Sequence, residues 1–293
     1  MNKILTLLMA ATFLTSCNNN TQKADAYGNF EADETMVSAE TNGKILWLDI
    51  EEGSIIDKNQ TVGLIDTIMP TLQLKEIVAQ GTRIKANIKS VQSQSEILKQ
   101  QKKNLLVDLE RIKNLKNSGA ATQKQFDDAT GGLQIIEKQI QANETQKFAI
   151  ATELKVLDTK KMLINEQLIK CRVKNPIKGT ILEKYAETGE VTAAGKPLYK
   201  IADVKNIILR AYVSGGQLHK IIKGKKCKVL IDKGKKEYLE FEGTTIWISS
   251  KAEFTPKIIQ TKQERVNMVY AIKIKVKNNG SIKIGMPAEV FFN

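Results

Sequence analysis

The 293-residue chain is poor in several residue types, with one histidine, five prolines, three cysteines and 5% aromatic residues. The single histidine, His219, cannot form a metal site with two distant cysteines, nor does any Ser-His-Asp or Cys-His catalytic set surround it. The run KGKK (Lys223–Lys226) lacks the glycine spacing of a phosphate loop. So low an aromatic content is unusual in a compact enzyme and is typical of a coiled coil joined to small β modules. We therefore expect no catalytic, cofactor-binding or metal-binding residues.

Cysteine is too scarce for a disulfide framework in the body of the chain. Cys171 and Cys227 are the two that lie there. Two separate buried thiols are expected, and a single bridge between them is the alternative. The third cysteine, Cys17, ends the stretch MNKILTLLMAATFLTSC, which has one basic residue and an apolar run from Ile4 to Leu14. That run is too short for a stable membrane span and indicates an export signal.

The residues Leu14-Thr15-Ser16-Cys17 resemble the bacterial lipobox. The resemblance implies that residues 1–16 are a lipoprotein signal peptide and that Cys17 is acylated; a plain signal peptide with a chance cysteine is the alternative. Acyl chains contribute about 0.8 kcal/mol per buried methylene and would anchor the protein to a membrane. Polar residues 17–26 would then form a tether. The expected location is the periplasmic side of a bacterial cell envelope, with the inner membrane favoured over the outer.

Acidic residues are scarce at the C-terminal end and basic ones at the N-terminal end. Residues 1–66 hold 4 basic and 10 acidic side chains, whereas residues 204–293 hold 18 basic and 7 acidic ones. Nucleic acid is a poor partner for an exported chain with so few stacking aromatics. The basic segment suits anionic lipid headgroups better, and simple solvation of strand faces is the alternative.

Glycine and proline are almost absent from two arms of about fifty residues between Leu72 and Cys171, where apolar residues recur in alternating steps of four and three. The repeating positions are Ile77, Gly81, Ile84, Ile88, Val91, Ser95, Leu98, Lys102, Leu105, Leu109, Ile112 and Lys116, then Phe126, Ala129, Leu133, Ile136, Ile140, Asn143, Lys147, Ile150, Leu154, Leu157, Lys161, Ile164, Leu168 and Cys171. Most are apolar, which predicts a coiled-coil seam over residues 67–170.

The seam is interrupted once, at NLKNSGAATQKQF. Gly119 suits a left-handed helix C-cap, and Thr122 followed by Gln125 is a capping box that opens a second helix. The arms should therefore fold back as an antiparallel hairpin, each about 70 Å long at 1.5 Å per residue. Folding about Gly119 pairs apolar with apolar positions, for example Ile84 with Leu154, and pairs the polar exceptions Ser95 and Asn143 with each other.

An internal repeat flanks the hairpin. Val37–Asp66 and Arg172–Ala202 align without a gap, so that Gly43 falls on Gly179 and Gly53 on Gly189. Each half predicts strand, glycine turn, strand and turn, which is too few strands to be stable alone. We expect residues 37–66 and 171–203 to close one small flattened barrel, with the hairpin inserted between them.

These halves resemble the split biotinyl-lipoyl domain of the HlyD-type membrane fusion proteins, or periplasmic adaptor subunits. The likeness extends over nearly the whole chain after the signal, including YGNFEADE, the segment that starts NIILRAYVSGG, AEFTPK and the closing IKIGMPAEVFF. It implies an α+β fold: a long antiparallel coiled-coil hairpin inserted into a split lipoyl-like β domain, followed by a β-barrel domain of residues 204–293 with residues 27–36 as its N-terminal strand. In lipoyl and biotinyl carriers the modified lysine occupies the turn that the hairpin replaces here, so no cofactor is expected.

The resemblance also implies a function and partners. It indicates a homo-hexameric adaptor that links an inner-membrane ABC-type permease and ATPase to a TolC-like outer-membrane channel. Adaptors of RND-type pumps usually carry a further membrane-proximal domain, for which this chain ends early, so an ABC-type partner is favoured over the RND alternative. A structural or binding lipoprotein with a coiled-coil stalk and no transporter is the other alternative.

The hairpin tip carries the expected contact with the outer-membrane channel. In the family an arginine, a leucine four residues on and a serine across the turn make this contact. Arg111 and Leu115 occupy the first two places, and Thr122 stands where serine is expected. The resemblance implies that Arg111 donates to carbonyls of the channel, while Leu115 buries between hairpins. Thr122 keeps the hydroxyl and adds a methyl group. The alternative is that Thr122 only caps the second helix and that Arg111 is a solvated side chain on the flank of the first.

Overall fold

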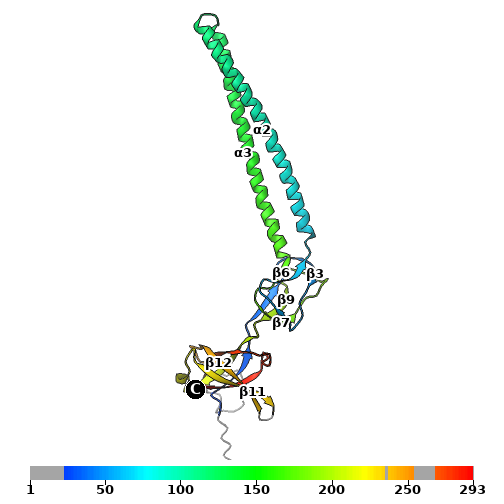
Figure 1. Ribbon diagram of the computed structural model, residues 1–293, viewed down its shortest axis with the longest axis vertical. Coiled ribbons are helices and arrows are strands. Elements are labelled where there is room, and N and C mark those ends of the chain that lie inside the picture. The colour runs from blue at the N-terminus through cyan, green and yellow to red at the C-terminus, as the bar shows by residue number, and fades with distance from the viewer. Residues whose placement is uncertain (1–22, 235–236, 254–267, 293) are drawn as a thin grey trace, which may run out of the picture.

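The computed structural model describes residues 23–234, 237–253 and 268–292. Cys17, the predicted signal peptide and most of the AEFTPK segment therefore lie outside the described residues. The described part is an elongated molecule in which a β-barrel, a β-sandwich and a two-helix hairpin follow one another along the long axis (Figure 1). This is the α+β architecture predicted from the sequence.

The hairpin consists of α2 (Ile68–Asn117) and α3 (Gln123–Lys170). Every predicted seam position except Lys161 is buried or half-buried, whereas Lys161 is exposed. A Cβ added at Gly81 would lie 3.4 Å from Leu157, three residues along each arm from the predicted pair Ile84 and Leu154. Ser95 and Asn143 are both buried, as their predicted pairing requires. The heptad register is confirmed.

The β-sandwich is made of two four-stranded sheets, and each sheet takes two strands from each half of the repeat. One sheet has the order β2 (Glu34–Ser38), β9 (Pro197–Ala202), β7 (Gly179–Lys184) and β4 (Ile55–Ile56); the other has β6 (Arg172–Lys174), β5 (Thr61–Ile65), β3 (Gly43–Leu48) and β8 (Val191–Thr192). The halves interleave, so neither can complete a sheet alone.

The repeat extends to backbone geometry. The amide of Ile45 donates to the carbonyl of Glu190 (2.8 Å), and its equivalent Ile181 donates to Ser54 (2.9 Å). Asn59 has a φ of 65° and stands where the second half has Gly195, with a φ of 88°. Asparagine tolerates this left-handed conformation better than most residues. Thus a nearly two-fold arrangement joins two segments that the whole hairpin separates in the chain.

One buried side chain breaks this symmetry. Asn175 is fully buried, and its amide nitrogen donates to the carbonyls of Ile56 (3.4 Å), Asp57 (2.9 Å) and Ile177 (2.6 Å). The hydroxyl of buried Tyr199 donates to the Asn175 Oδ1 (3.2 Å). Asn175 therefore joins the second half of the sandwich to the first through hydrogen bonds that water cannot replace.

The barrel closes in the order β1 (Ala26–Glu31), β10 (Asn206–Ser214), β13 (Val269–Lys277), β12 (Glu237–Ile248), β11 (Lys226–Gly234) and β14 (Pro287–Phe292). Alternate residues of β10 are buried, so one face of the strand fills the interior. Gly28 of β1 lies against β10, where a Cβ would stand 2.1 Å from the carbonyl oxygen of Arg210. A short 3₁₀ helix, η2 (Leu218–Lys220), lies between β10 and β11.

Two predictions about local structure have definite outcomes. Cys171 and Cys227 are separate buried thiols, which confirms the preferred prediction over a bridge. The segment 27–36, predicted as one strand of the barrel, is instead divided after Glu31. Residues Glu34–Ser38 pair with β9 in the sandwich. The chain leaves the barrel there because its next strand completes the other domain.

Candidate functional site at the hairpin tip

The tip is a short turn in which the end of α2 is closed by hydrogen bonds to its last carbonyls. The Ser118 hydroxyl donates to the carbonyl of Leu115 (2.9 Å), as does the Ala120 amide (2.8 Å). Gly119 has a φ of 77° and its amide donates to Lys116 (3.0 Å). A left-handed glycine that closes a helix in this way is a common C-cap, as predicted.

Thr122 begins α3 with a complete capping box. Its hydroxyl oxygen accepts from the Gln125 amide (3.2 Å), and its own amide donates to the Gln125 side-chain oxygen (2.8 Å). Two amides that helix geometry leaves unpaired are thereby satisfied. The predicted cap is confirmed, and the Thr122 side chain remains exposed to solvent.

Arg111 and Leu115 lie on the last turns of α2. Because they are four residues apart, they share one face of the helix. The Arg111 side chain is 68% exposed and makes one ion pair, 3.3 Å from Nη1 to the Asp108 carboxylate on the preceding turn. A guanidinium has five donors, so most of its hydrogen-bonding capacity stays available. Leu115 is 43% exposed, so its side chain is available for contact with a partner.

A cation–π contact supports the turn from within, and the heptad pattern did not predict it. The Lys116 ammonium lies 4.5 Å from the centre of the Phe126 ring, across the turn from α2 to α3. Such a contact contributes about 0.5–1 kcal/mol at an exposed site. The sequence signal that could have predicted this contact is Lys116, a lysine at a seam position beside the predicted turn.

The tip therefore offers a small rigid surface with guanidinium donors, an exposed leucine and a hydroxyl. It offers no nucleophile paired with a base. Across residues 23–234, 237–253 and 268–292, no three His, Cys, Asp or Glu side chains come together as metal ligands. Surface recognition is the activity that these side chains suit.

Relatives of known sequence include bacterial proteins described as UPF0194 membrane proteins. One from Yersinia pseudotuberculosis serotype O:3 (strain YPIII) is 26% identical, covering 91% of this chain and 88% of its own length. Another, from Acidithiobacillus ferridurans, is 23% identical over 90% of this chain and 85% of its own length. No protein-family model matches the chain.

Solved structures with the same arrangement include two at a TM-score of 0.53. MacA from Actinobacillus actinomycetemcomitans is 19% identical and covers 90% of this chain and 76% of its own. The membrane fusion protein Spr0693 from Streptococcus pneumoniae R6 is 14% identical and covers 91% and 97%. The chain has the fold of a membrane fusion protein. This fold is the α+β architecture expected from the sequence.

Within the part of the chain that the structure describes, no helix is both long and apolar enough to cross a bilayer.

Proposed function

We propose that the protein is a lipid-anchored periplasmic adaptor of a tripartite exporter. Its barrel and sandwich would rest on an inner-membrane ABC-type permease with its ATPase, and its hairpins would meet a TolC-like channel. Six copies would form the conduit. The protein would seal this conduit and couple the transporter to the channel, with no chemical step of its own.

The observation that carries the proposal is the position and rigidity of the tip. Two helices of 50 and 48 residues hold it about 75 Å from the sandwich at 1.5 Å per residue. The capping box and the left-handed glycine fix its backbone, while Arg111 and Leu115 stay exposed on one face. A preorganised surface loses little freedom on binding, which favours contact with a partner.

Reversal of the charge at Arg111 tests the tip. We expect Arg111→Asp to abolish export in cells, because a carboxylate would face the channel carbonyls that the guanidinium is proposed to bind. Folding should be little changed, since the ion pair lost with Asp108 is exposed and contributes at most about 1 kcal/mol. Export and helical circular dichroism are the two measurements.

The matched control is Lys113→Asp, which makes the same charge change on the same turns of α2. Lys113 is exposed and two residues from Arg111, so it points away from the shared face of Arg111 and Leu115. Normal export by the Arg111 variant, or equal loss in both variants, would remove the tip assignment.

The alternatives have tests of their own. Crosslinking in cells followed by identification of partners separates an ABC-type from an RND-type transporter, and a stalk lipoprotein would capture neither. An intact mass of the purified mature chain tests the anchor: acyl chains on residue 17 are expected, with no lipoyl or biotinyl group elsewhere. An unmodified cysteine would contradict lipidation and leave the tip assignment standing.

A further inference from the structure

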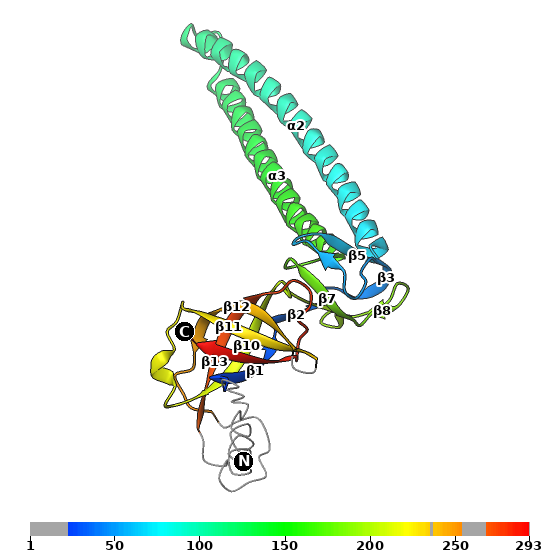
Figure 2. The same ribbon diagram turned by 60° about the horizontal axis from the view of Figure 1, so that its bottom comes forward.

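The barrel has two different ends. Strands β1 and β10 connect one end to the sandwich. The opposite end gathers the first residue of β1 and the last residues of β10 and β14, as the pairs Ala26–Val290 and Ser214–Val269 indicate. The start of β11 lies there as well, because Cys227 pairs with Phe292. The chain therefore enters the barrel at the end opposite to the strand ends that lead to the sandwich. Figure 2 shows the sandwich between the barrel and the hairpin.

A loop between β10 and β11 lies beside this point of entry. We call residues 218–225 the basic loop. Gln217, directly before it, donates from Nε2 to the carbonyl of Asp25 (2.8 Å). Asp25 is itself held by the Phe292 amide, which donates to its carboxylate (2.9 Å). Asp25 is eight residues after Cys17, a span of at most about 28 Å even when fully extended. An acyl group on Cys17 would keep the basic loop close to the membrane surface.

The charges of the basic loop are not neutralised locally. Lys220, Lys223 and Lys225 are exposed, and no acidic side chain among the described residues lies within 4.0 Å of their ammonium groups. Lysines on the adjoining strand differ: Lys226 pairs with Glu242 (2.9 Å) and Lys228 with Glu240 (2.6 Å). Uncompensated charge is therefore concentrated in the loop.

The backbone of the loop is fixed to the barrel. Ile221 is buried in the barrel core, whereas its neighbour Ile222 is 51% exposed between the lysines. The Gly224 amide donates to the carbonyl of Thr245 (2.8 Å), and the Thr245 amide donates to Lys225 (3.0 Å). The lysines and the exposed isoleucine are thus presented together on an ordered support.

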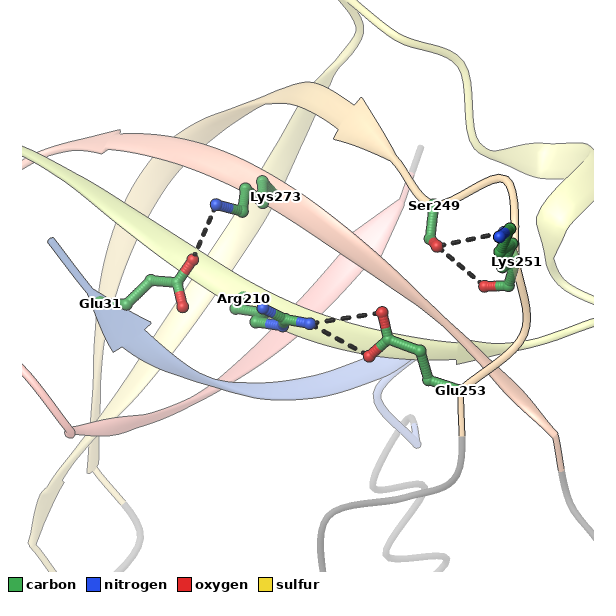
Figure 3. Close-up of polar contacts among 6 residues, drawn as sticks. All are labelled: Glu31, Arg210, Ser249, Lys251, Glu253 and Lys273. Atoms are coloured by element: carbon green, nitrogen blue, oxygen red, sulfur yellow. Dashed lines mark hydrogen bonds and ion pairs between the residues drawn. The ribbon is translucent and has the colours of Figure 1, made fainter. Parts of the chain in front are cut away.

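One carboxylate at this end of the barrel is paired with an arginine. Glu253 follows β12 at the same end of the barrel, and the Arg210 guanidinium holds both its oxygens at 3.0 and 3.3 Å (Figure 3). The charge of Glu253 is therefore balanced by Arg210 of β10. Figure 3 also shows Ser249 closing the same turn by accepting from the Lys251 amide and donating to the Lys251 carbonyl.

We propose that the basic loop binds the anionic headgroups of the bilayer, with Ile222 inserted at the interface. The proposal goes beyond the adaptor function and rests on its lipid anchor only for proximity. Ammonium groups beside one exposed aliphatic side chain match a bilayer surface, where anionic headgroups cover apolar acyl chains. An anchored acyl chain would make this second contact intramolecular, which raises its effective concentration.

The test uses the chain from residue 18 to 293, purified without lipid, which retains every described element. Its probes are vesicles of phosphatidylglycerol and phosphatidylcholine in equal parts, and vesicles of phosphatidylcholine alone. We expect sedimentation with the anionic vesicles only, weakened by salt. Replacing Lys220, Lys223 and Lys225 with glutamine should lower the partition coefficient about 100-fold, since each lysine contributes about 1 kcal/mol near such a surface. Ile222→Ser should lower it less.

The control triple carries the same change in net charge on the hairpin, at Lys85, Lys89 and Lys160, which are exposed. It should bind anionic vesicles within about twofold of the parent chain, because these lysines lie on α2 and α3 and outside the basic loop. Equal loss in both triples, or no binding of the parent chain to anionic vesicles, would overturn the proposal. A third result would also overturn it: the lysine-to-glutamine triple loses binding to a purified transporter but keeps binding to anionic vesicles. The partner of the loop would then be a protein.

Discussion

The hairpin and the barrel solve the problem of burial in different ways. The two helices contain 98 residues, yet only six side chains are buried: Ile84, Val91, Ser95, Leu98, Asn143 and Leu157. Two of those six are polar. The barrel buries sixteen apolar residues in one cluster. A two-helix seam has one line of contact, whereas a closed sheet surrounds its core on all sides. Stability therefore resides in the β domains, and the helices provide reach.

The sandwich is the second β domain, and it gives the strongest test of the conclusion that stability resides in the β domains. Asn175→Leu should lower the free energy of unfolding of the sandwich by about 3–5 kcal/mol, because three carbonyls and the Tyr199 hydroxyl lose a buried partner. Denaturant unfolding followed by tryptophan fluorescence measures it, since Trp47 lies on β3 of the sandwich.

The matched control for that variant is Asn59→Gly, which gives the first half the residue that the second half has at Gly195. Its free energy of unfolding should change by less than about 0.5 kcal/mol, since glycine adopts the same left-handed conformation. A mild effect of Asn175→Leu would mean that the halves are held by apolar packing alone.

The free energy of unfolding should fall at alkaline pH because Cys227 is buried inside the barrel. Burial raises the pKa of its thiol to about 11, above the ordinary value of about 8.5 in unfolded chains. Between these values the unfolded chain releases the proton and the folded chain retains it. The contribution of the protonated Cys227 thiol to the free energy of unfolding is therefore complete below about pH 8.5 and is lost as the pH rises toward about 11.

The expected loss for the parent chain is on the order of 2–3 kcal/mol over that pH range. Cys227→Ala should be less stable at neutral pH and should lack this part of the decline. Parallel pH curves for the two proteins would contradict the expectation. Cys171 provides a comparison at the base of the hairpin, where burial also raises the thiol pKa.

The smallest expected effect lies in the hairpin. The Asn143 Oδ1 is buried and has no hydrogen-bond partner in the described residues. Asn143→Leu should stabilise the helices by about 1–2 kcal/mol, because the unsatisfied acceptor is removed and an apolar seam position is filled. Thermal melting of the helical circular dichroism measures this. A lower melting temperature would show instead that the polar layer of Ser95 and Asn143 is needed to hold the register.

The parts predicted from sequence are those in which a period or a local rule determines structure. Apolar steps of four and three predicted the seam, and the alignment of the halves predicted the sandwich. Gly119 and Thr122 identified the turn because caps involve residues only three or four apart. At the tip, the sequence located Arg111 and Leu115 on one face, and their roles as contacts stay a prediction.

The parts that were not predicted depend on single contacts between distant segments. The amide of Asn175 reaches Asp57, and the side chain of Gln217 reaches Asp25, and neither contact belongs to a repeating pattern. Lys161 shows the opposite failure. It fits the heptad, yet it lies on α3 near the base of the hairpin and stays exposed. The other seam lysines are half-buried because each has a partner: Glu137 for Lys102, Phe126 for Lys116 and Glu144 for Lys147.

The insertion of the hairpin between two neighbouring strands has a mechanical consequence. β5 leads into α2 and β6 follows α3, and the two strands are antiparallel partners, joined also by the Ile65 amide and the Cys171 carbonyl (2.8 Å). A pull on the tip along the helices therefore draws β5 and β6 in the same direction and slides β5 against β3. Such a load is shared by several ladder hydrogen bonds at once, whereas peeling would break them in turn. The base of the hairpin is thus built to transmit tension without unzipping.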